Sequence, residues 1–458
     1  MDRREKCPLP GHADNVTCCW GRRQRFQQSI KKASLELNGH NRSLRPMRIV
    51  DVSAFYAPCG GGVRTYVEAK LKAAARFGHE VIVIAPGKEH ATVRRGPGAI
   101  LVTIPSPLLP VDRRYRYFND ERALHAELDA WQPDHVEASS PWSSATMVGR
   151  WQGAASRSLV MHSDPLAAYA YRWLGGLAST STIDRCFQWF WRHLRGLGRM
   201  YDVVVCSNSQ LSDRLRAGGI QNSETLRMGV EPGVFSPSLR SAEVREAALS
   251  ALGLDADSVL LVGVGRFSAE KRWETVMRAV AETARRHPVG LLLVGDGRKR
   301  QKLELLAERL PTVTVMERLA DRHEVARLLA SADALVHGCE AETFCMVAAE
   351  ARASGIPLIV PDRGAALDHL VRGGGTVYRA GSEISLERAI RRFIARGPEL
   401  QRAAAVRASQ VRTMDEHFAD LFARYSQIGT PAYQPAGATA SIGGLVDVAL
   451  ARSAVRTS

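Results

Sequence analysis

The chain has 458 residues, of which 45% are hydrophobic and 24% are charged. This length exceeds what one compact core usually supports, and the composition excludes a chain that is disordered throughout. The net charge of +15 at pH 7 favours an acidic partner: a phosphorylated small molecule, anionic lipid headgroups or a nucleic acid. We expect no nucleic acid, because the sequence carries no aromatic RNA-binding pattern, Cys/His finger or basic zipper.

Cysteine usage and hydropathy bear on the compartment. The eight cysteines are scattered and include no CxxC pair, which indicates reduced thiols in a cytosolic enzyme. No apolar run approaches the roughly 20 residues that cross a bilayer, and the N-terminus lacks the apolar core of a signal peptide. We therefore expect a cytoplasmic protein whose membrane contact would be peripheral, on the inner face of the plasma membrane.

Residues 1–46 are predicted to be a disordered basic extension. They show neither helical nor strand periodicity and carry ten Lys and Arg against four acids. The extension could lie on anionic lipid, or it could be dispensable, since MRIVDVS at Met47 is typical of a first strand. A metal cluster could also be drawn there from Cys7, His12, Cys18 and Cys19. Adjacent cysteines in a polar tail need no such explanation.

From Met47 onward, apolar strands alternate with segments long enough for helices. In the first half the strands are RIVDVS, HEVIVIAP, AILVTIP, DHVEASS, SLVMHS and DVVVCSNS, with a helix from about Val63 to Phe77. After the Gly- and Pro-containing MGVEPGVFSP, the pattern restarts with SVLLVGVGRFS, VGLLLVGDG, TVTVME, DALVHG and IPLIVPD. This alternation is typical of α/β domains with doubly wound parallel sheets.

The two halves predict two Rossmann-like domains, at 47–235 and 236–400. Residues 401–427 are predicted to be C-terminal helices, and the Ala-, Gly- and Ser-rich 428–458 a loose tail. Two such domains that face each other hold a ligand in the central cleft, beyond the carboxyl ends of the strands. Candidate site residues should therefore directly follow strands.

The turn GVGRFSAEKRWE follows the first strand of the second half. It places Arg266 and Lys271 five residues apart, before a helix expected to begin near Glu270. Two cations and a helix N-terminus suit a pyrophosphate that no metal neutralises. The alternative is a solvated basic turn.

The next such turn, LLLVGDGRKR, contains Gly295 and Gly297, which permit close backbone approach, and Asp296, which is predicted to cap the following helix. A simple capping turn would explain this segment equally well.

The stretch GCEAETFCMVAAEARASG carries two glutamates, Glu342 and Glu350. We predict that its helix begins near Phe344 or Cys345, which places Glu342 in the preceding loop and Glu350 in the second turn. The first amides of the helix would be free donors at a positive dipole end. The two carboxylates could then hold a hexose and a ribose, or they could be the solvated face of an ordinary helix.

Taken together, these segments resemble a known family. A G-G-G loop after the first strand, R-x4-K, V-G-D-G, and E-T-F-x5-E followed by A-x-A-S-G-x-P are similar to the retaining nucleotide-sugar glycosyltransferases of family 4. The resemblance covers residues 47–427 and implies the GT-B fold, with an acceptor domain first and a donor domain second.

The resemblance also implies roles for the residues at the matching positions. Arg266 and Lys271 would bind the donor diphosphate, Glu350 the ribose, and Glu342 the hydroxyls of the transferred sugar. Further donor-site positions are Gly61, Gly62, Gly295, Phe344, Cys345 and Met346. His162 matches the histidine found at the reaction centre, where we expect it to orient the donor sugar.

Some positions depart from the family pattern. Cys345 replaces the usual glycine after the phenylalanine, and His337-Gly338-Cys339 replaces the usual Pro-Ser. Met228 stands where asparagine is common. The sugar pocket is therefore expected to differ from the common one, which leaves a UDP-sugar and a GDP-sugar both open as donors.

The expected reaction needs no metal or other cofactor, because no Asp-x-Asp motif sits at a strand end. The resemblance implies retention at the anomeric carbon, with the leaving phosphate helping to deprotonate the acceptor hydroxyl. The alternatives are a catalytically silent GT-B binding or regulatory module and a GT-B nucleotide-sugar epimerase.

Two segments of the first half bear on the acceptor. PLLPVDRRYRYF and RCFQWFWRHLRGLGRMYD interleave aromatic and basic residues, which suits a membrane interface. The second could instead be a helix whose aromatic residues pack inward. We expect the acceptor to be a membrane lipid or a lipid-linked glycan.

Overall fold

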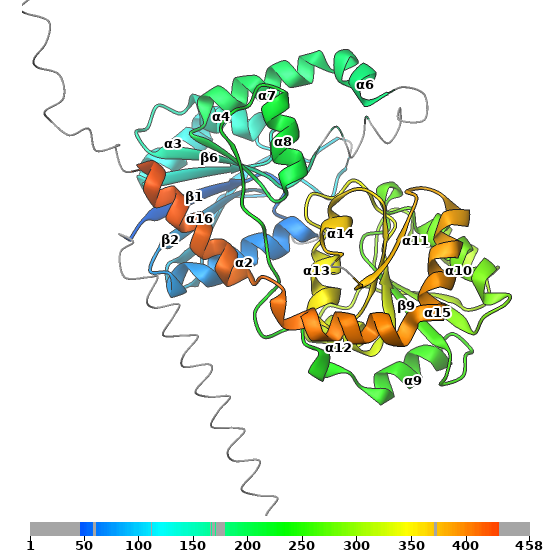
Figure 1. Ribbon diagram of the computed structural model, residues 1–458. Helices are drawn as coiled ribbons and strands as arrows, with labels where there is room; N and C mark the ends of the chain where they lie inside the picture. Colours follow the sequence, from blue (N-terminus) through cyan, green and yellow to red (C-terminus); the bar gives the residue numbers. More distant parts are fainter. Residues whose placement is uncertain are drawn as a thin grey trace, which may run out of the picture.

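The computed structural model describes residues 46–57, 61–110, 112–164, 166, 170, 179–370 and 373–429. They form two lobes, each built around its own sheet with helices on both faces (Figure 1). The prediction of two Rossmann-like domains in a GT-B arrangement is confirmed. The strands of the first lobe end at Thr225 and those of the second begin at Val259, on either side of the predicted boundary at 235.

The first lobe contains an eight-stranded sheet of order β3-β4-β2-β1-β5-β6-β7-β8. Its strands are β1 (Arg48–Ser53), β2 (Glu80–Gly87), β3 (Ala91–Gly96), β4 (Ala99–Pro105), β5 (His135–Ser139), β6 (Ser156–Met161), β7 (Val203–Cys206) and β8 (Ser223–Thr225). All neighbours pair in parallel except β3, which runs antiparallel to β4. The sequence did not predict β3, because ATVRRG is polar and exposed and has no apolar face to mark it.

Helices cover both faces of this sheet. One face packs against α3 (Glu121–Trp131), α4 (Ser143–Arg150), α6 (Thr180–Cys186), α7 (Gln188–Met200) and α8 (Ser209–Ala217). The other packs against α2 (Gly62–Arg76) and α16 (Met414–Gly429). The central strands are therefore buried on both sides, which explains their continuous apolar sequences.

The second lobe contains a six-stranded, wholly parallel sheet of order β11-β10-β9-β12-β13-β14. Its strands are β9 (Val259–Val264), β10 (Val289–Val294), β11 (Val313–Met316), β12 (Ala334–Val336), β13 (Leu358–Pro361) and β14 (Gly375–Tyr378). One face packs against α9 (Ala242–Ser250), α12 (Arg322–Ser331), α13 (Met346–Ala353) and α14 (Ala365–Asp368). The other packs against α10 (Trp273–Ala284), α11 (Arg300–Ala307) and α15 (Glu383–Arg407).

Within the described residues, the chain crosses between the lobes twice. It leaves the first lobe after β8, and returns after α15 through a short 3-10 helix, Ala408–Gln410 (Figure 1). At the return, Val230 and Thr413 form a parallel bridge that ties the two crossing segments together. The last described helix, α16, then completes the core of the first lobe rather than the second.

Candidate active site

The loop after β9 carries three cations: Lys271 is buried, Arg266 is exposed, and Arg272 forms an ion pair with Glu340. The Trp273 indole donates a hydrogen bond of 2.8 Å to the Arg266 carbonyl, which pins the start of the loop beneath α10. The Lys271 side chain is 9% exposed, whereas that of Arg266 is 52% exposed and its Nη2 lies 3.9 Å from Glu270 Oε1. A 3-10 turn, Ala269–Lys271, stands where the helix was expected to begin, and α10 starts at Trp273. Of the two predicted diphosphate ligands, only Lys271 points into the protein.

Lys271 forms an ion pair with Glu342 Oε1. Glu342 lies in the loop between β12 and α13, as predicted, and its second oxygen is 3.3 Å from His337 Nε2. Gly338 makes this possible, because a Cβ there would lie only 2.3 Å from the Lys271 carbonyl oxygen. The structure therefore joins the R-x4-K turn to the first glutamate of the E-T-F segment.

Glu350 occupies a separate environment in the second turn of α13, again as predicted. It is 4% exposed and its Oε1 accepts a 2.7 Å hydrogen bond from Arg322 at the start of α12. The sequence did not single out Arg322, because twenty-eight residues separate it from Glu350. The two glutamates are thus held by different cations, which fits different tasks for them.

The N-terminus of α13 faces that of α2 from the other lobe. Helix α13 begins at Met346, after Cys345 in a left-handed conformation (φ 60°) with no side-chain cap. A Cβ added to Gly62, the first residue of α2, would lie 3.5 Å from Met346 Sδ. Phe344, edge-on to the His369 ring at 4.8 Å between centroids, fixes the approach to α13. Two helix N-termini thus converge, which favours an anion between them.

His162 lies at the end of β6 and is tied to both lobes. Its Nε2 is 3.2 Å from Ser139 Oγ, and its carbonyl accepts a 2.9 Å hydrogen bond from Thr343 of the second lobe. Ser207 Oγ donates to the Thr343 carbonyl at 2.9 Å, which adds a further link between the lobes. Burial, helped by the charge on Lys70, lowers the pKa of His162 to about 4, so the ring is neutral at pH 7.

Comparisons with known proteins agree with this geometry. Residues 60–234 match the family model of Glycosyltransferase Family 4, and residues 244–410 match that of Glycosyl transferases group 1. A GDP-mannose-dependent alpha-mannosyltransferase of Mycolicibacterium smegmatis is 30% identical over 362 residues, 76% of this chain and 89% of the relative. The chain belongs to the group 1, family 4 glycosyltransferases.

A second relative is similar over nearly its whole length. The GDP-mannose-dependent alpha-(1-6)-phosphatidylinositol dimannoside mannosyltransferase of Mycobacterium tuberculosis (strain ATCC 25177 / H37Ra) is 29% identical over 379 residues, 82% of this chain and 95% of the relative. Among solved structures, a sucrose-phosphate synthase from Thermosynechococcus elongatus has a TM-score of 0.68 at 20% identity, covering 84% of this chain and 99% of the other. That likeness supports the GT-B fold.

The glycosyltransferase has a buried charge network behind His162 that the sequence did not predict. Lys70 of α2, which is inaccessible to solvent, binds Asp51 Oδ2 at 2.7 Å and Glu137 Oε1 at 2.6 Å. Tyr425 of α16 donates to Glu137 Oε2 at 2.7 Å. Burial and the neighbouring Asp51 raise the pKa of Glu137 to about 7. The one available signal was a lysine within the apolar stripe of the predicted helix.

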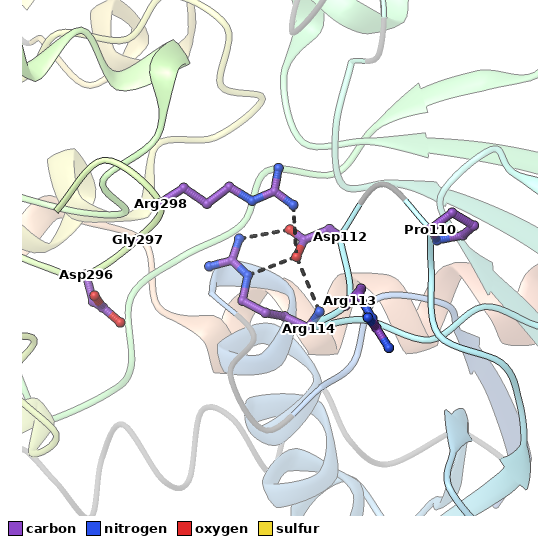
Figure 2. A pocket seen from close by; sticks show the side chains of 7 residues that line it. All are labelled: Pro110, Asp112, Arg113, Arg114, Asp296, Gly297 and Arg298. Carbon is purple, nitrogen blue, oxygen red and sulfur yellow. Dashed lines mark hydrogen bonds and ion pairs between the residues drawn. The ribbon is translucent and has the colours of Figure 1, made fainter. Parts of the chain in front are cut away.

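An open groove of about 590 Å³ lies where the lobes meet. Figure 2 shows Asp112 of the first lobe between two arginines. Asp112 Oδ2 is 2.8 Å from Arg114, and its Oδ1 is 3.2 Å from Arg298 of the second lobe. These arginines hold the pKa of the Asp112 carboxyl well below its usual range. The groove is therefore spanned by an ion pair between the lobes.

The VGDG turn differs from its prediction. Lys299, not Asp296, is the N-cap residue of α11, and no side chain caps that helix, so the predicted Asp296 cap is wrong. A turn separates Gly297 from α11. Gly297 (φ 155°) approaches the loop after β9 so closely that a Cβ there would lie 2.6 Å from the Phe267 carbonyl oxygen. A Cβ on Gly295 would similarly lie 2.0 Å from the Gly265 carbonyl oxygen. Gly295 thus packs against the loop that carries Lys271.

Outside this site, two features bear on the acceptor. None of the helices in the described part of the chain is long and apolar enough to span a membrane. In α7, Phe190 and Trp191 pack inward, whereas the Trp189 side chain is 60% exposed.

Gly61, the remaining predicted donor-site residue, directly precedes α2 and is exposed.

Proposed function

We propose that this glycosyltransferase moves a mannosyl unit from GDP-mannose to a hydroxyl of a membrane lipid or lipid-linked glycan. We further propose that the anomeric configuration is retained and that no divalent metal takes part. The names of the relatives specify GDP-mannose as donor and, in one case, phosphatidylinositol dimannoside as acceptor. The donor and acceptor of this chain are inferred from those names.

The observation that carries the proposal is the position of the Lys271–Glu342 pair beside the start of α13, opposite Gly62. A diphosphate there would meet one ammonium and the amides of two helix N-termini, each charge-assisted hydrogen bond contributing about 1.5–3 kcal/mol. This arrangement can stabilise a leaving diphosphate without a metal ion. Glu342, released from Lys271, would accept hydrogen bonds from hydroxyls of the transferred sugar.

The remaining residues divide the other tasks. His162, neutral at pH 7, would orient the donor sugar through a ring nitrogen. Glu350 would bind the ribose together with Arg322. The acceptor hydroxyl would attack from the face that the diphosphate leaves, and a departing phosphate oxygen would take its proton.

The transfer assay uses the purified chain with GDP-mannose, UDP-glucose or ADP-glucose, each with and without a membrane lipid extract and with EDTA throughout. We expect GDP release from GDP-mannose only when extract is present, together with a mannolipid whose new linkage is α by NMR. Nucleotide release without acceptor, or a β linkage, would contradict the transfer or the retention respectively.

Lys271→Met tests the diphosphate site. Because one charge-assisted donor to the leaving group is lost, we expect kcat/KM for the nucleotide sugar to fall about a hundredfold or more. The matched control is Lys302→Met, whose side chain is 69% exposed on α11 and which should keep wild-type kinetics. Equal kinetics for both variants would remove Lys271 from the site.

A membrane contact is proposed for α6 and α7, at the outer edge of the first lobe (Figure 1). Trp189, Arg192 and Arg199 of α7 are exposed and recur at helical spacing, and the exposed Arg185 lies near the end of α6. Arginines that meet lipid phosphate on either side of an indole at headgroup level fit an anionic bilayer surface.

Liposome co-sedimentation tests this contact. We expect binding that rises with the fraction of anionic lipid and falls severalfold in Trp189→Ala. Ile384→Ala, which removes a 64% exposed side chain in the second lobe, is the control and should bind as the wild type does. Binding that ignores anionic lipid content would rule the contact out.

A further inference from the structure

Three potential metal ligands lie together beside the proposed sugar site. His337 Nε2 is 3.5 Å from Cys345 Sγ and 3.3 Å from Glu342 Oε2. All three ligand atoms lie within 4.8 Å of one another. They come from the end of β12, the following loop and the residue that precedes α13, so one segment of chain folds around a single point.

These distances suit a tetrahedral ion. Bonds of about 2.0–2.3 Å to nitrogen, oxygen and sulfur place neighbouring ligand atoms of a zinc site roughly 3.3–3.7 Å apart. The two His337 distances already lie within this range, and only the separation of Cys345 Sγ and Glu342 Oε2 needs to adjust. Three protein ligands leave a fourth position for water, as in zinc sites that are not purely structural.

The ligand atoms are also chemically available. Lys271 uses Glu342 Oε1, which leaves Oε2 to face His337, and that buried oxygen has no hydrogen-bond partner among the described residues. Burial and the charge on Lys271 lower the pKa of His337, so its ring is neutral and can offer a lone pair. Burial raises the pKa of the Cys345 thiol to about 12, so the metal must displace its proton.

We propose that His337, Glu342 and Cys345 form a reversible site for a thiophilic divalent cation such as Zn²⁺, and that its occupancy blocks the transferred sugar. Binding replaces the S–H bond of Cys345 by an S–metal bond, and the proton leaves to solvent. Magnesium and manganese, which prefer oxygen ligands, should not compete. The blocking part rests on the proposed function, because it requires Glu342 to hold sugar hydroxyls.

The surroundings favour reversible rather than permanent occupancy. A histidine that binds a metal tightly usually donates its other ring N–H to a carbonyl or carboxylate. His337 Nδ1 is buried and has no such partner in the described part of the structure. The ammonium of Lys271, paired with Glu342, would also lie next to a bound ion and weaken its binding. The site is thus suited to inhibition that a chelator relieves.

Cobalt provides a test that does not depend on turnover. Titrating the full chain with CoCl₂ in weak buffer should produce a near-ultraviolet sulfur-to-cobalt charge-transfer band and release one proton per ion at this site. The band that belongs to this site is obtained by subtracting the absorption spectrum of Cys345→Ser from that of the wild type. Cys339→Ser, in the same loop, should keep it, and Glu342→Gln should weaken cobalt binding at least tenfold. Identical spectra for wild type and Cys345→Ser would overturn the site.

Kinetics test the blocking separately. With an active transferase, ZnCl₂ should inhibit competitively against the nucleotide sugar, EDTA should restore the rate, and excess MgCl₂ should have no effect. A cobalt band without zinc inhibition would refute the block while leaving the site intact. If no transferase activity is found, the cobalt titration still shows whether the metal site exists. The metal site and the proposed function can therefore fail independently.

Discussion

Ser139 determines which nitrogen of His162 carries the proton. Asp51 Oδ1 accepts a hydrogen bond of 3.0 Å from Ser139 Oγ, so the hydroxyl hydrogen points toward Asp51. His162 Nε2, 3.2 Å from the same oxygen, must then be the donor. This leaves Nδ1 as an acceptor, which in the proposed function takes a sugar hydroxyl. Lys70 holds the other Asp51 oxygen and keeps the carboxylate in place.

Ser139→Ala tests this positioning. Loss of one hydrogen bond, about 1–1.5 kcal/mol, should lower kcat roughly tenfold with little change in KM, because His162 loses its orientation but the diphosphate contacts remain. Ser139→Thr, which keeps the hydroxyl, should recover most of the rate. Ser212→Ala, at another buried serine in α8, should leave kcat unchanged. An equal loss in both alanine variants would indicate a structural effect alone.

At the scale of elements, α16 is the last described helix and yet part of the core of the first lobe. Its Phe418, Leu421, Phe422 and Tyr425 are inaccessible to solvent. Tyr425 stacks on His135 of β5 at 3.7 Å between ring centroids and reaches Glu137 through its hydroxyl. The helix thus reaches the network behind His162 from about 290 residues away.

Leu421→Ala should destabilise the first lobe. Truncating a fully buried leucine leaves a cavity and costs about 2–5 kcal/mol of unfolding free energy. Leu305→Ala removes the same atoms from a side chain that is 52% exposed on α11 and should change stability by less than about 0.5 kcal/mol. Urea unfolding followed by circular dichroism measures both. A Leu421→Ala midpoint equal to that of the wild type would show that α16 is dispensable.

At the scale of the whole molecule, buried histidines set the response to acid. The pKa values are lowered to about 3 for His135 and His417 and to about 4 for His162 and His369, mainly by burial. Each stabilises the fold fully above the ordinary value near 6.5 and loses this contribution as the pH falls toward 3–4. Glu137, whose pKa is raised to about 7, acts in the opposite direction between 4.5 and 7.

Four histidines outweigh one glutamate, so stability should fall on acidification. Near pH 5 these five groups together leave the unfolded chain with about three more protons than the folded one, which corresponds to a slope on the order of 4 kcal/mol per pH unit. His337, whose pKa burial also lowers, acts in the same direction. We expect the urea midpoint to drop steadily between pH 7 and pH 5. A midpoint that stays flat or rises on acidification would show that these rings take up protons in the folded state.

The sequence alone determined the features that depend on local periodicity and spacing. Apolar runs that alternate with segments long enough for helices predicted two parallel sheets, because such strands are buried on both faces. The glycine and proline after α13 and the helix formers within it placed Glu342 in a loop and Glu350 in a helix. The family pattern then followed from the order of these segments, which needs no knowledge of distant contacts.

Only the tertiary structure decided which distant residues meet. Nothing local marks Lys70 as the partner of Asp51 and Glu137, α16 as part of the first lobe, or Arg322 as the cation of Glu350. The same holds for His337 beside Glu342 and Cys345, whose geometry depends on how one loop folds back on a strand end. Burial strengthens such pairings and also makes them invisible in a sequence, since each partner alone looks like an ordinary polar residue.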